Sequence, residues 1–281
     1  MKQLYRVIAR IYVFVFGRSQ LQFINKMVLR LALCARGYSG VPGDKAPASC
    51  DVISACEARF IKVVSTHLSG LCIDIGANKG QYSAALLEAT TARIIAFEPL
   101  PGAYQELVAL SDKYPGRLLA VNKGVGDKNV ELELYYGDED SKLASFSSEV
   151  NEIPYVGASN VHSILVPMVT LDEYFLADKR LIPNSGIDLI KIDTEGYEYN
   201  VLLGAQILVA TVKPRFIQIE YNLHQLIRSH SLYSISLLLA GYNIYQLLPH
   251  GRGLFNIDPK HPESNIYHYS NFVFVRSDLT M

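Results

Sequence analysis

The chain has 281 residues, of which 49% are hydrophobic and 19% are charged, a composition typical of a globular protein with a sizeable core. A formal net charge of −1 excludes the concentrated basic character of most nucleic-acid-binding proteins, so we expect no nucleic acid partner. The four cysteines form no CxxC pair, which argues against a zinc site or a disulfide framework and favours a reducing cytoplasm.

The first segment of the chain differs from the rest in charge. Residues 1–43 contain seven basic residues and no acidic residue, which leaves 19 basic and 27 acidic residues in the remainder. At about 100° per residue, Lys2, Arg6 and Arg10 fall on one side of a helix, opposite an apolar stripe that includes Leu4 and Ile8. The longest apolar run is far shorter than the roughly 20 residues of a membrane span.

Such a basic amphipathic helix is typical of peripheral contact with an anionic membrane, here at its cytoplasmic face. The same pattern equally fits a helix whose apolar side packs on the domain that follows it. We predict a helical extension and linker over residues 1–45 and one domain over residues 46–281.

Within this domain, short apolar runs alternate with helical patterns. The alternation predicts an α/β fold with a doubly wound, mostly parallel sheet, whose ligands bind at the carboxyl ends of the strands. The expected strands are Leu71–Ile75, Arg93–Phe97, Leu118–Asn122, Asp188–Ile192, Phe216–Glu220, Tyr242–Leu247 and Asn271–Val275. The expected helices are Gln81–Ala89, Gly102–Lys113, Tyr199–Val209 and Ser231–Ala240. Between residues 127 and 172 the pattern gives a half-exposed strand, a polar loop and a second strand that leads into a helix.

The first predicted strand ends in the motif DxGxxxG, formed by Asp74, Gly76 and Gly80. A nicotinamide or flavin fingerprint has glycine in place of this acid, because a carboxylate would repel the pyrophosphate. Asp74 would instead attract an ammonium group, such as the amino group of S-adenosylmethionine, whose carboxylate would bond to the backbone amides near Gly76 to Gly80. The alternative is a glycine turn that only closes a tight corner.

The second predicted strand ends in Glu98 and Pro99, where an acid accepts hydrogen bonds from both ribose hydroxyls of a nucleoside. After the third strand, Asp127 or a nearby amide lies where an adenine would reach, although a surface turn explains this segment equally well. We therefore predict a cofactor site made of Asp74, Gly76, Ala77, Asn78, Gly80, Tyr82, Glu98, Pro99, Gly126 and Asp127.

A second group of polar residues follows the fourth and fifth predicted strands. Asp193 and Glu195 are two acids in one turn, which repel each other unless a cation, a proton or a hydrogen bond compensates them. They are candidates for a catalytic base or a cation site, and the alternative is that Thr194 or Asp193 caps the next helix while Glu198 complements its dipole. Glu220 and His224 extend this catalytic group, and His224 could accept a proton near neutral pH. Lys191 would face away from Asp193 if the strand stays regular.

Together these segments resemble the FkbM-type S-adenosylmethionine-dependent methyltransferases. The motifs that carry the resemblance are "IDIGANKGQYS", "IIAFEPLPGAYQEL", "VNKGVGD", "VTLDEYF", "IDLIKIDTEGYEYNVLLGA" and "IQIEYN". The resemblance implies a class I methyltransferase fold with a seven-stranded sheet, whose last strand pair is antiparallel. It also implies that Asp74, Gly76, Asn78, Gly80 and Glu98 hold the cofactor and that Asp193 and Glu195 face the acceptor. Tyr197 departs from the family pattern, which often has alanine there.

We therefore expect an O-methyltransferase that acts on a hydroxyl group, in a glycan or glycolipid precursor or in another small molecule such as a polyketide. Glu195 or Asp193 is the expected base. We predict no resident metal, with a divalent cation held by Asp193 and Glu220 as the alternative. The rival readings are a dehydrogenase on the same type of sheet, a nucleic-acid methyltransferase and a non-catalytic scaffold.

Overall fold

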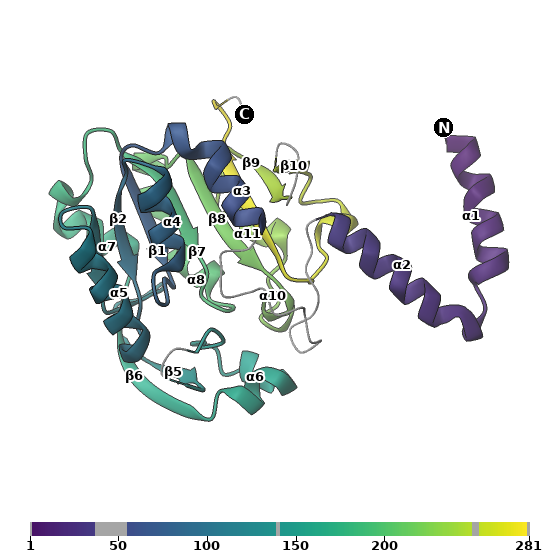
Figure 1. The fold of residues 1–281 in the computed structure, drawn as a ribbon, viewed down its shortest axis with the longest axis horizontal. Helices are drawn as coiled ribbons and strands as arrows, with labels where there is room; N and C mark the ends of the chain where they lie inside the picture. The colour runs from purple at the N-terminus through teal and green to yellow at the C-terminus, as the bar shows by residue number, and fades with distance from the viewer. Residues whose placement is uncertain (1, 37–54, 139–140, 249–252, 280–281) are drawn as a thin grey trace.

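A computed structural model describes residues 2–36, 55–138, 141–248 and 253–279. Its main sheet has eight strands in the order β10-β9-β11-β8-β7-β1-β2-β3 (Figure 1). Strands β3, β2, β1, β7 and β8 pair in parallel, whereas β11 is antiparallel to both β8 and β9. The strands are β1 (Leu71–Ile75), β2 (Arg93–Phe97), β3 (Leu118–Val121), β7 (Ile187–Ile192), β8 (Phe216–Tyr221), β9 (Tyr242–Leu247), β10 (Leu254–Ile257) and β11 (Ser270–Arg276).

All seven strands predicted from the sequence are present, each with ends within one residue of the expected ones. The predicted number of seven was wrong, because β10 adds an eighth strand at the edge of the sheet. This strand has only four residues, and Phe255 and Asn256 are both exposed. Its sequence therefore lacks the alternation of apolar and polar residues by which a strand is recognised. The predicted α/β class is confirmed, because the sheet is mostly parallel and helices cover both of its faces.

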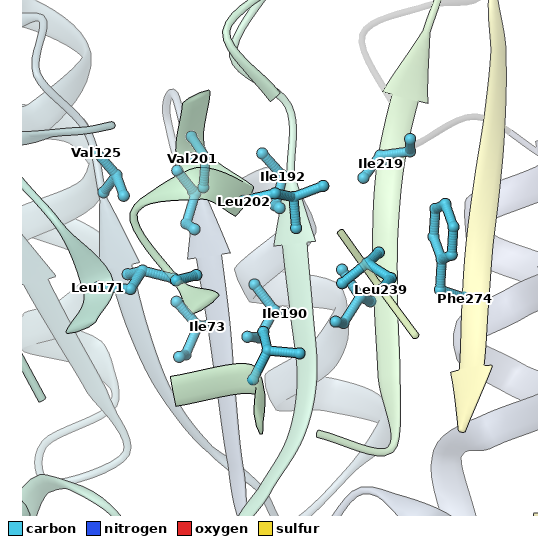
Figure 2. Close-up of a cluster of buried hydrophobic side chains, with 14 of the residues drawn as sticks. Ile73, Val125, Leu171, Ile190, Ile192, Val201, Leu202, Ile219, Leu239 and Phe274 are labelled. Carbon is cyan, nitrogen blue, oxygen red and sulfur yellow. The ribbon is translucent and has the colours of Figure 1, made fainter. Parts of the chain in front are cut away.

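Helices cover both faces of this sheet (Figure 1). The central strands β1, β7 and β8 are buried along their whole length, as expected for strands covered on both sides. One face packs against α3 (Ala55–Val64), α4 (Gln81–Ala89) and α5 (Pro101–Lys113). The other packs against α7 (Leu171–Ala177), α8 (Glu198–Leu203), α9 (Gln206–Val212) and α11 (Leu232–Leu237). Figure 2 shows this second face, where Ile73, Ile190 and Ile219 from adjacent strands meet Leu202 and Leu239.

The single helix expected over Tyr199–Val209 is two helices, α8 and α9, which are separated at Gly204 and Ala205. A Cβ atom at Gly204 would lie 1.9 Å from the carbonyl oxygen of Gly126, so the glycine allows the two backbones to touch. The break therefore comes from a tertiary contact, which a helical periodicity does not reveal.

A second, three-stranded sheet has the order β4-β6-β5, with β4 (Gly124–Val125), β5 (Glu131–Tyr136) and β6 (His162–Val169). The chain between β5 and β6 includes α6 (Pro154–Ser159) and contacts the strand ends of the main sheet. Ser145 Oγ donates to the carbonyl of Glu195 at 2.7 Å, and the Asn78 side chain donates to the carbonyl of Ser141 at 3.4 Å. This segment therefore borders the edge where ligands of such sheets bind.

The N-terminal residues form α1 (Lys2–Phe16), a short 3-10 turn (Ser19–Leu21) and α2 (Gln22–Ala35), which extend away from the domain (Figure 1). In the part of the chain that the structure describes, no single helix has the length and apolar character needed to cross a bilayer. The stretches Gln3–Phe16 and Ser19–Leu33 satisfy both criteria only when taken together, and they are bent by 98°. The predicted domain boundary near residue 45 lies outside the described residues.

A buried cation links the two strands at the centre of the sheet. Lys191 on β7 lies directly opposite Asp74 on β1, and its Nζ is 3.6 Å from Asp74 Oδ1 and 2.9 Å from Asp193 Oδ2. The expectation that Lys191 faces away from Asp193 was wrong, because side chains two residues apart share one face of a strand. Burial alone would lower the pKa of Lys191, but the charges of Asp193 and Asp74 raise it, so the ammonium group stays charged.

We expect Lys191→Met to lower the free energy of unfolding by about 3–5 kcal/mol, because it leaves Asp74 buried without its cation. Urea denaturation measures this loss. Adding Asp74→Asn to Lys191→Met removes the uncompensated charge and should recover part of the stability. Lys123→Met, at an exposed position, is the matched control. An equal effect of Lys191→Met and Lys123→Met would contradict the role assigned to the buried pair.

Candidate active site

The corner between β1 and α4 is packed against the end of β7. Gly76 has a φ of +73°, and a Cβ atom there would lie 1.8 Å from the carbonyl oxygen of Asp193. Gly80, at φ +80°, precedes the first residue of α4 and contacts the side chains of Leu107 and Leu110. Glycine is required at both positions because other residues rarely adopt this backbone conformation and a side chain would clash.

The backbone amides of this corner have partners within the protein. The amides of Gly76 and Ala77 both donate to the carbonyl of Phe97 at 3.0 Å, and the amide of Gly80 donates to the carbonyl of Ala77 at 2.9 Å. The amide of Asn78 donates to Glu98 Oε2 at 2.7 Å. The expectation that these amides wait for a ligand carboxylate therefore needs correction, since here they hold the corner against β2.

Asp74 is also more fully paired than expected. It has no exposed surface, and Ser83 Oγ donates to its Oδ2 at 2.7 Å. Its Oδ1 accepts no hydrogen bond, and the nearby charge is the Lys191 ammonium described above. Lys191 thus supplies a positive charge beside the Asp74 carboxylate, at the position predicted for the ammonium group of the cofactor. Burial raises the pKa of Asp74, and the Lys191 charge opposes this rise.

Tyr82 lies in the core, with its hydroxyl donating to Gln218 Oε1 at 2.6 Å. The Lys191 Nζ lies 5.3 Å from the centre of the Tyr82 ring. The structure therefore gives Tyr82 a supporting role behind Lys191, which differs from the expected contact with the cofactor.

Glu98 joins the end of β2 to the first corner. Its carboxylate accepts hydrogen bonds from the amides of Asn78 at 2.7 Å and Leu100 at 2.8 Å. The Asn122 side chain donates to the carbonyls of Glu98 and Pro99 and fixes this loop. Burial raises the pKa of Glu98 to about 7, although both amide hydrogen bonds oppose the rise. The structure thus brings Asn78 and Glu98, two of the predicted cofactor residues, into direct contact.

Gly126 and Asp127 lie next to α8. The amide of Gly126 donates to the carbonyl of Val169 at 3.0 Å, and Asp127 Oδ1 accepts from the Asn200 side chain at 3.0 Å. Among the described residues, no hydrogen bond joins this pair to Asp74 or Glu98. The pair borders a cavity of about 180 Å³ that Tyr197 and Met168 also line. The predicted contact with adenine remains a prediction.

Tyr197, the departure from the family pattern, fills a cluster beneath the second sheet. Its ring lies 5.5 Å from that of Phe146, and the Arg228 guanidinium lies 5.0 Å from the ring centre. Only 8% of the residue is exposed. The side chain therefore packs as a core residue and also forms one wall of the cavity.

Three carboxylates meet at the ends of β7 and β8. Oxygen atoms of Asp193, Glu195 and Glu220 all lie within 4.8 Å of one another. The side chains of Asp193 and Glu195 are 28% and 16% exposed, whereas Glu220 is buried. The structure therefore brings together the acids predicted from two separate turns, with two of them open to an incoming molecule.

Each of these acids has one oxygen atom held by a neighbour. Lys191 bonds to Asp193 Oδ2, His224 Nδ1 lies 3.0 Å from Glu195 Oε2, and the Asn222 side chain donates to Glu220 Oε1 at 2.7 Å. Glu220 Oε2 is buried and accepts no hydrogen bond. Such outer partners fix the orientation of carboxylates in catalytic and metal-binding sites.

The charges of the group follow from these contacts. Burial would raise the pKa of Asp193, but the Lys191 charge and the hydrogen bonds with Glu220 and Lys191 together outweigh burial, and the pKa falls. Burial and the neighbouring charges of Glu195 and Asp193 raise the pKa of Glu220 well above its ordinary value. Burial would lower the pKa of His224, but its contact with Glu195 and the charges of Glu198 and Asp193 together outweigh burial and raise the pKa.

Glu195 has a strained backbone, with a φ of +50° that non-glycine residues rarely adopt. Gly196 follows at φ +99°, and a Cβ atom there would lie 3.0 Å from both His224 Cβ and Val150 Cγ2. The hydrogen bond from Ser145 to the Glu195 carbonyl supports this conformation. Strain of this kind is frequent at functional sites, where surrounding contacts maintain it.

The helix-cap alternative for Asp193 is not what the structure shows, because Tyr197 occupies the N-cap position of α8. The loop is held by Glu198, whose carboxylate accepts from the amides of Thr194 at 2.8 Å and Gly196 at 3.1 Å. Gln225 Nε2 donates to Glu198 Oε2 at 2.5 Å.

The sequence alone did not reveal that Glu198 and Gln225 hold this loop. One signal was available: Asn222 and Gln225 have the spacing of a capping box, which the structure contains at the start of α10 (Leu223–Ile227). That motif places the Gln225 side chain beneath the catalytic group.

A family model and a curated relative match parts of this chain. The methyltransferase FkbM domain matches residues 74–237. The hexuronic acid methyltransferase AglP of Haloferax volcanii is 27% identical over 131 residues, which are 47% of this chain and 48% of that protein. The chain thus spans about half the length of this curated relative.

Solved structures show distant similarity. Precorrin-6y C5,15-methyltransferase from Geobacter metallireducens has 12% identity and a TM-score of 0.39, with 84% of this chain and 97% of that chain covered. Aeropyrum pernix fibrillarin with natively bound S-adenosyl-L-methionine has 9% identity and a TM-score of 0.37, with 78% and 73% covered. The FkbM match covers more than half of the 281 residues and includes Asp74, Glu98 and the acids at the ends of β7 and β8. The chain therefore belongs to the FkbM methyltransferase family.

Proposed function

We propose that the protein transfers the methyl group of S-adenosylmethionine to a hydroxyl group of a sugar, in a glycan or glycolipid precursor. The observation that carries the proposal is the partly exposed pair Asp193 and Glu195, which lies beside the β1 corner of an FkbM domain. The name of the relative AglP, a hexuronic acid methyltransferase, supports a sugar acceptor.

The residues present fit this cofactor. Glu98 would accept hydrogen bonds from the ribose hydroxyls with the lone pairs that Asn78 and Leu100 leave over. Asp193, whose pKa is lowered, keeps a negative charge at the strand edge for the cationic end of the cofactor. Asp193 is the better candidate for direct contact because its side chain is partly exposed, whereas Asp74 has no exposed surface. The bound cofactor supplies an electrophilic methyl group on a sulfonium ion.

Glu195 is the proposed base, which takes the proton of the acceptor hydroxyl as that oxygen attacks. Both carboxylates are partly exposed, but the Lys191 ammonium bonds to Asp193 and keeps that carboxylate a weak base. A positioned general base contributes about 10²–10⁴-fold to the rate. Alignment of the acceptor oxygen in the site supplies much of the remaining acceleration.

His224 acts through Glu195 as a positioning residue. It is 1% exposed, and its Nδ1 lies 3.0 Å from Glu195 Oε2, a contact that becomes an ion pair when the imidazole is protonated. This contact leaves Glu195 Oε1 to face the acceptor. Glu220 lies on the buried side of the group, where its raised pKa favours the neutral carboxylic acid.

One observation favours a second form of the same chemistry, in which a divalent cation binds the acceptor hydroxyl. Asp193, Glu195 and Glu220 offer three carboxylate oxygens within 4.8 Å, and Glu220 Oε2 is buried without a hydrogen bond. An all-oxygen set of this kind suits Mg²⁺ or Mn²⁺. A bound cation would lower the pKa of the hydroxyl in place of the base.

The function is tested by incubating the protein with S-adenosylmethionine labelled in its methyl group and with oligosaccharides that contain hexuronic acids or neutral hexoses. Mass spectrometry should show a labelled methyl group on a sugar oxygen. Calorimetry with S-adenosylhomocysteine and with NADH separates the proposal from the dehydrogenase reading. Binding of NADH alone would overturn the proposal, and binding of S-adenosylhomocysteine without any methylated sugar would remove the sugar acceptor.

Affinity for S-adenosylhomocysteine should depend on pH through Glu98. Ribose hydroxyls donate to the ionised carboxylate, so protonation competes with binding. Because the pKa of Glu98 is about 7, we expect the dissociation constant to rise by up to about tenfold for each pH unit below about 7 and to be constant above about 8. Calorimetry across this range measures it. Glu98→Gln should bind weakly and without this pH dependence; an unchanged profile in that variant would contradict the assignment.

We expect Glu195→Gln to lower kcat by about 10²–10⁴-fold with little change in cofactor affinity, because the base is lost and the cofactor contacts remain. Asp193→Asn should also lower kcat, and urea denaturation should show a smaller loss of stability than for Lys191→Met, because Lys191 keeps Asp74 as a partner. Glu152→Gln, at an exposed position, is the matched control. Full activity of Glu195→Gln would remove Glu195 as the base.

If a divalent cation binds the acceptor hydroxyl, EDTA should abolish turnover and Mg²⁺ should restore it. This form of the chemistry also predicts that Mn²⁺, followed by electron paramagnetic resonance, binds the wild type and binds Glu220→Gln at least about tenfold more weakly, since one ligand oxygen is lost. Turnover that EDTA leaves unchanged would exclude this form and leave Glu195 as the base.

A further inference from the structure

The two N-terminal helices expose most of their apolar side chains. Of the 26 large hydrophobic residues that are exposed in the described part of the chain, 14 lie between Leu4 and Leu31. Phe14 and Phe23 are 77% and 65% exposed. Isolated exposed apolar residues are common on soluble proteins, but a continuous group of this size indicates a binding surface.

The domain does not cover this surface. Helix α1 and most of α2 extend away from the body of the protein (Figure 1). Contact with the domain is at the C-terminal end of α2, where Leu33 is buried and Arg36 pairs with Glu263 at 3.7 Å. The alternative that the apolar stripe of α1 packs on the protein's own domain therefore does not apply to the described arrangement.

The angle between the two helices is held by polar contacts. The Tyr12 hydroxyl donates to Asn25 Oδ1 at 2.8 Å, and the Asn25 side chain donates to the carbonyl of Phe16 at the end of α1, also at 2.8 Å. The rings of Tyr12 and Phe16 stack at 4.8 Å. These contacts link α1 to α2 across the break, so the pair presents its exposed apolar residues from a defined bend.

The charge of the segment identifies its occupant. Residues 1–36 contain seven basic residues and no acidic residue, and they precede a remainder with an excess of acids. Two copies of this segment would repel each other, which disfavours self-association through α1 and α2. An anionic bilayer attracts the same charges, at about 1 kcal/mol for each basic residue near its surface.

We propose that residues 1–36 bind the surface of an anionic bilayer, with the apolar side chains of α1 and α2 in the interface and the basic side chains at the lipid headgroups. Basic side chains at the border of an apolar face reach the headgroups with their charged ends while their stems remain in the apolar layer. The domain then stays in the aqueous phase, joined to the helices at the end of α2. This inference does not depend on the proposed reaction.

The test uses the full chain with vesicles of phosphatidylcholine alone and vesicles that also contain phosphatidylglycerol. We expect co-sedimentation at least about tenfold stronger with the anionic vesicles, weakened by salt. The double variant Ile8→Asp and Phe14→Asp and the double variant Arg6→Glu and Arg10→Glu should both lose binding. Leu237→Asp and Lys123→Glu, at exposed positions of the domain, should keep it.

Three results would overturn the inference. The first is an absence of binding to either kind of vesicle. The second is a dimer in light scattering that dissociates in the Ile8→Asp and Phe14→Asp variant. The third is bound protein that resists alkaline carbonate, which would indicate insertion across the bilayer. Calorimetry with S-adenosylhomocysteine on the same variants should match the wild type, so a failure of the proposed reaction is distinguishable from a failure of membrane binding.

Discussion

The buried ammonium group of Lys191 lies between Asp74 on β1 and Asp193 at the end of β7, and the geometry of the site depends on this contact. Without it, two carboxylates would share a nearly water-free space at the centre of the sheet. Compensation of one of these charges keeps Asp193 ionised and oriented at the strand edge. Tyr82 and Gln218 support the lysine from the face that α4 covers.

The corner after β1 connects the end of β7 with the end of β2. The corner after β1 contacts the carbonyl of Asp193 through Gly76, and it contacts β2 through Asn78 and Glu98. A displacement of β7 would therefore move both the residues predicted to hold the cofactor and those proposed to act on the acceptor. Shared backbone contacts can keep the cofactor site and the catalytic acids at a fixed distance and orientation, which methyl transfer requires.

The proposed catalytic group combines strain with hydrogen bonding. Glu195 is held at a positive φ by the contact with Ser145 and by the tight packing of Gly196 against His224. Glu198 satisfies the amides of the same turn, so the turn remains ordered without a helix cap from Asp193. The protein thus uses buried polar residues to position a small number of partly exposed acids. The N-terminal helices are separate from this network, which agrees with an independent role in localisation.

The sequence by itself determined the alternation of strands and helices, the DxGxxxG corner and the acids at four strand ends, because these features depend on local periodicity and on turn chemistry. Tertiary structure alone decided which groups meet. Lys191 and Asp74 are neighbours only through the pairing of β1 with β7, and Glu195 meets Glu220 only because β7 and β8 are adjacent. The edge strand β10 and the break at Gly204 likewise arise from contacts between distant segments, which no local pattern contains.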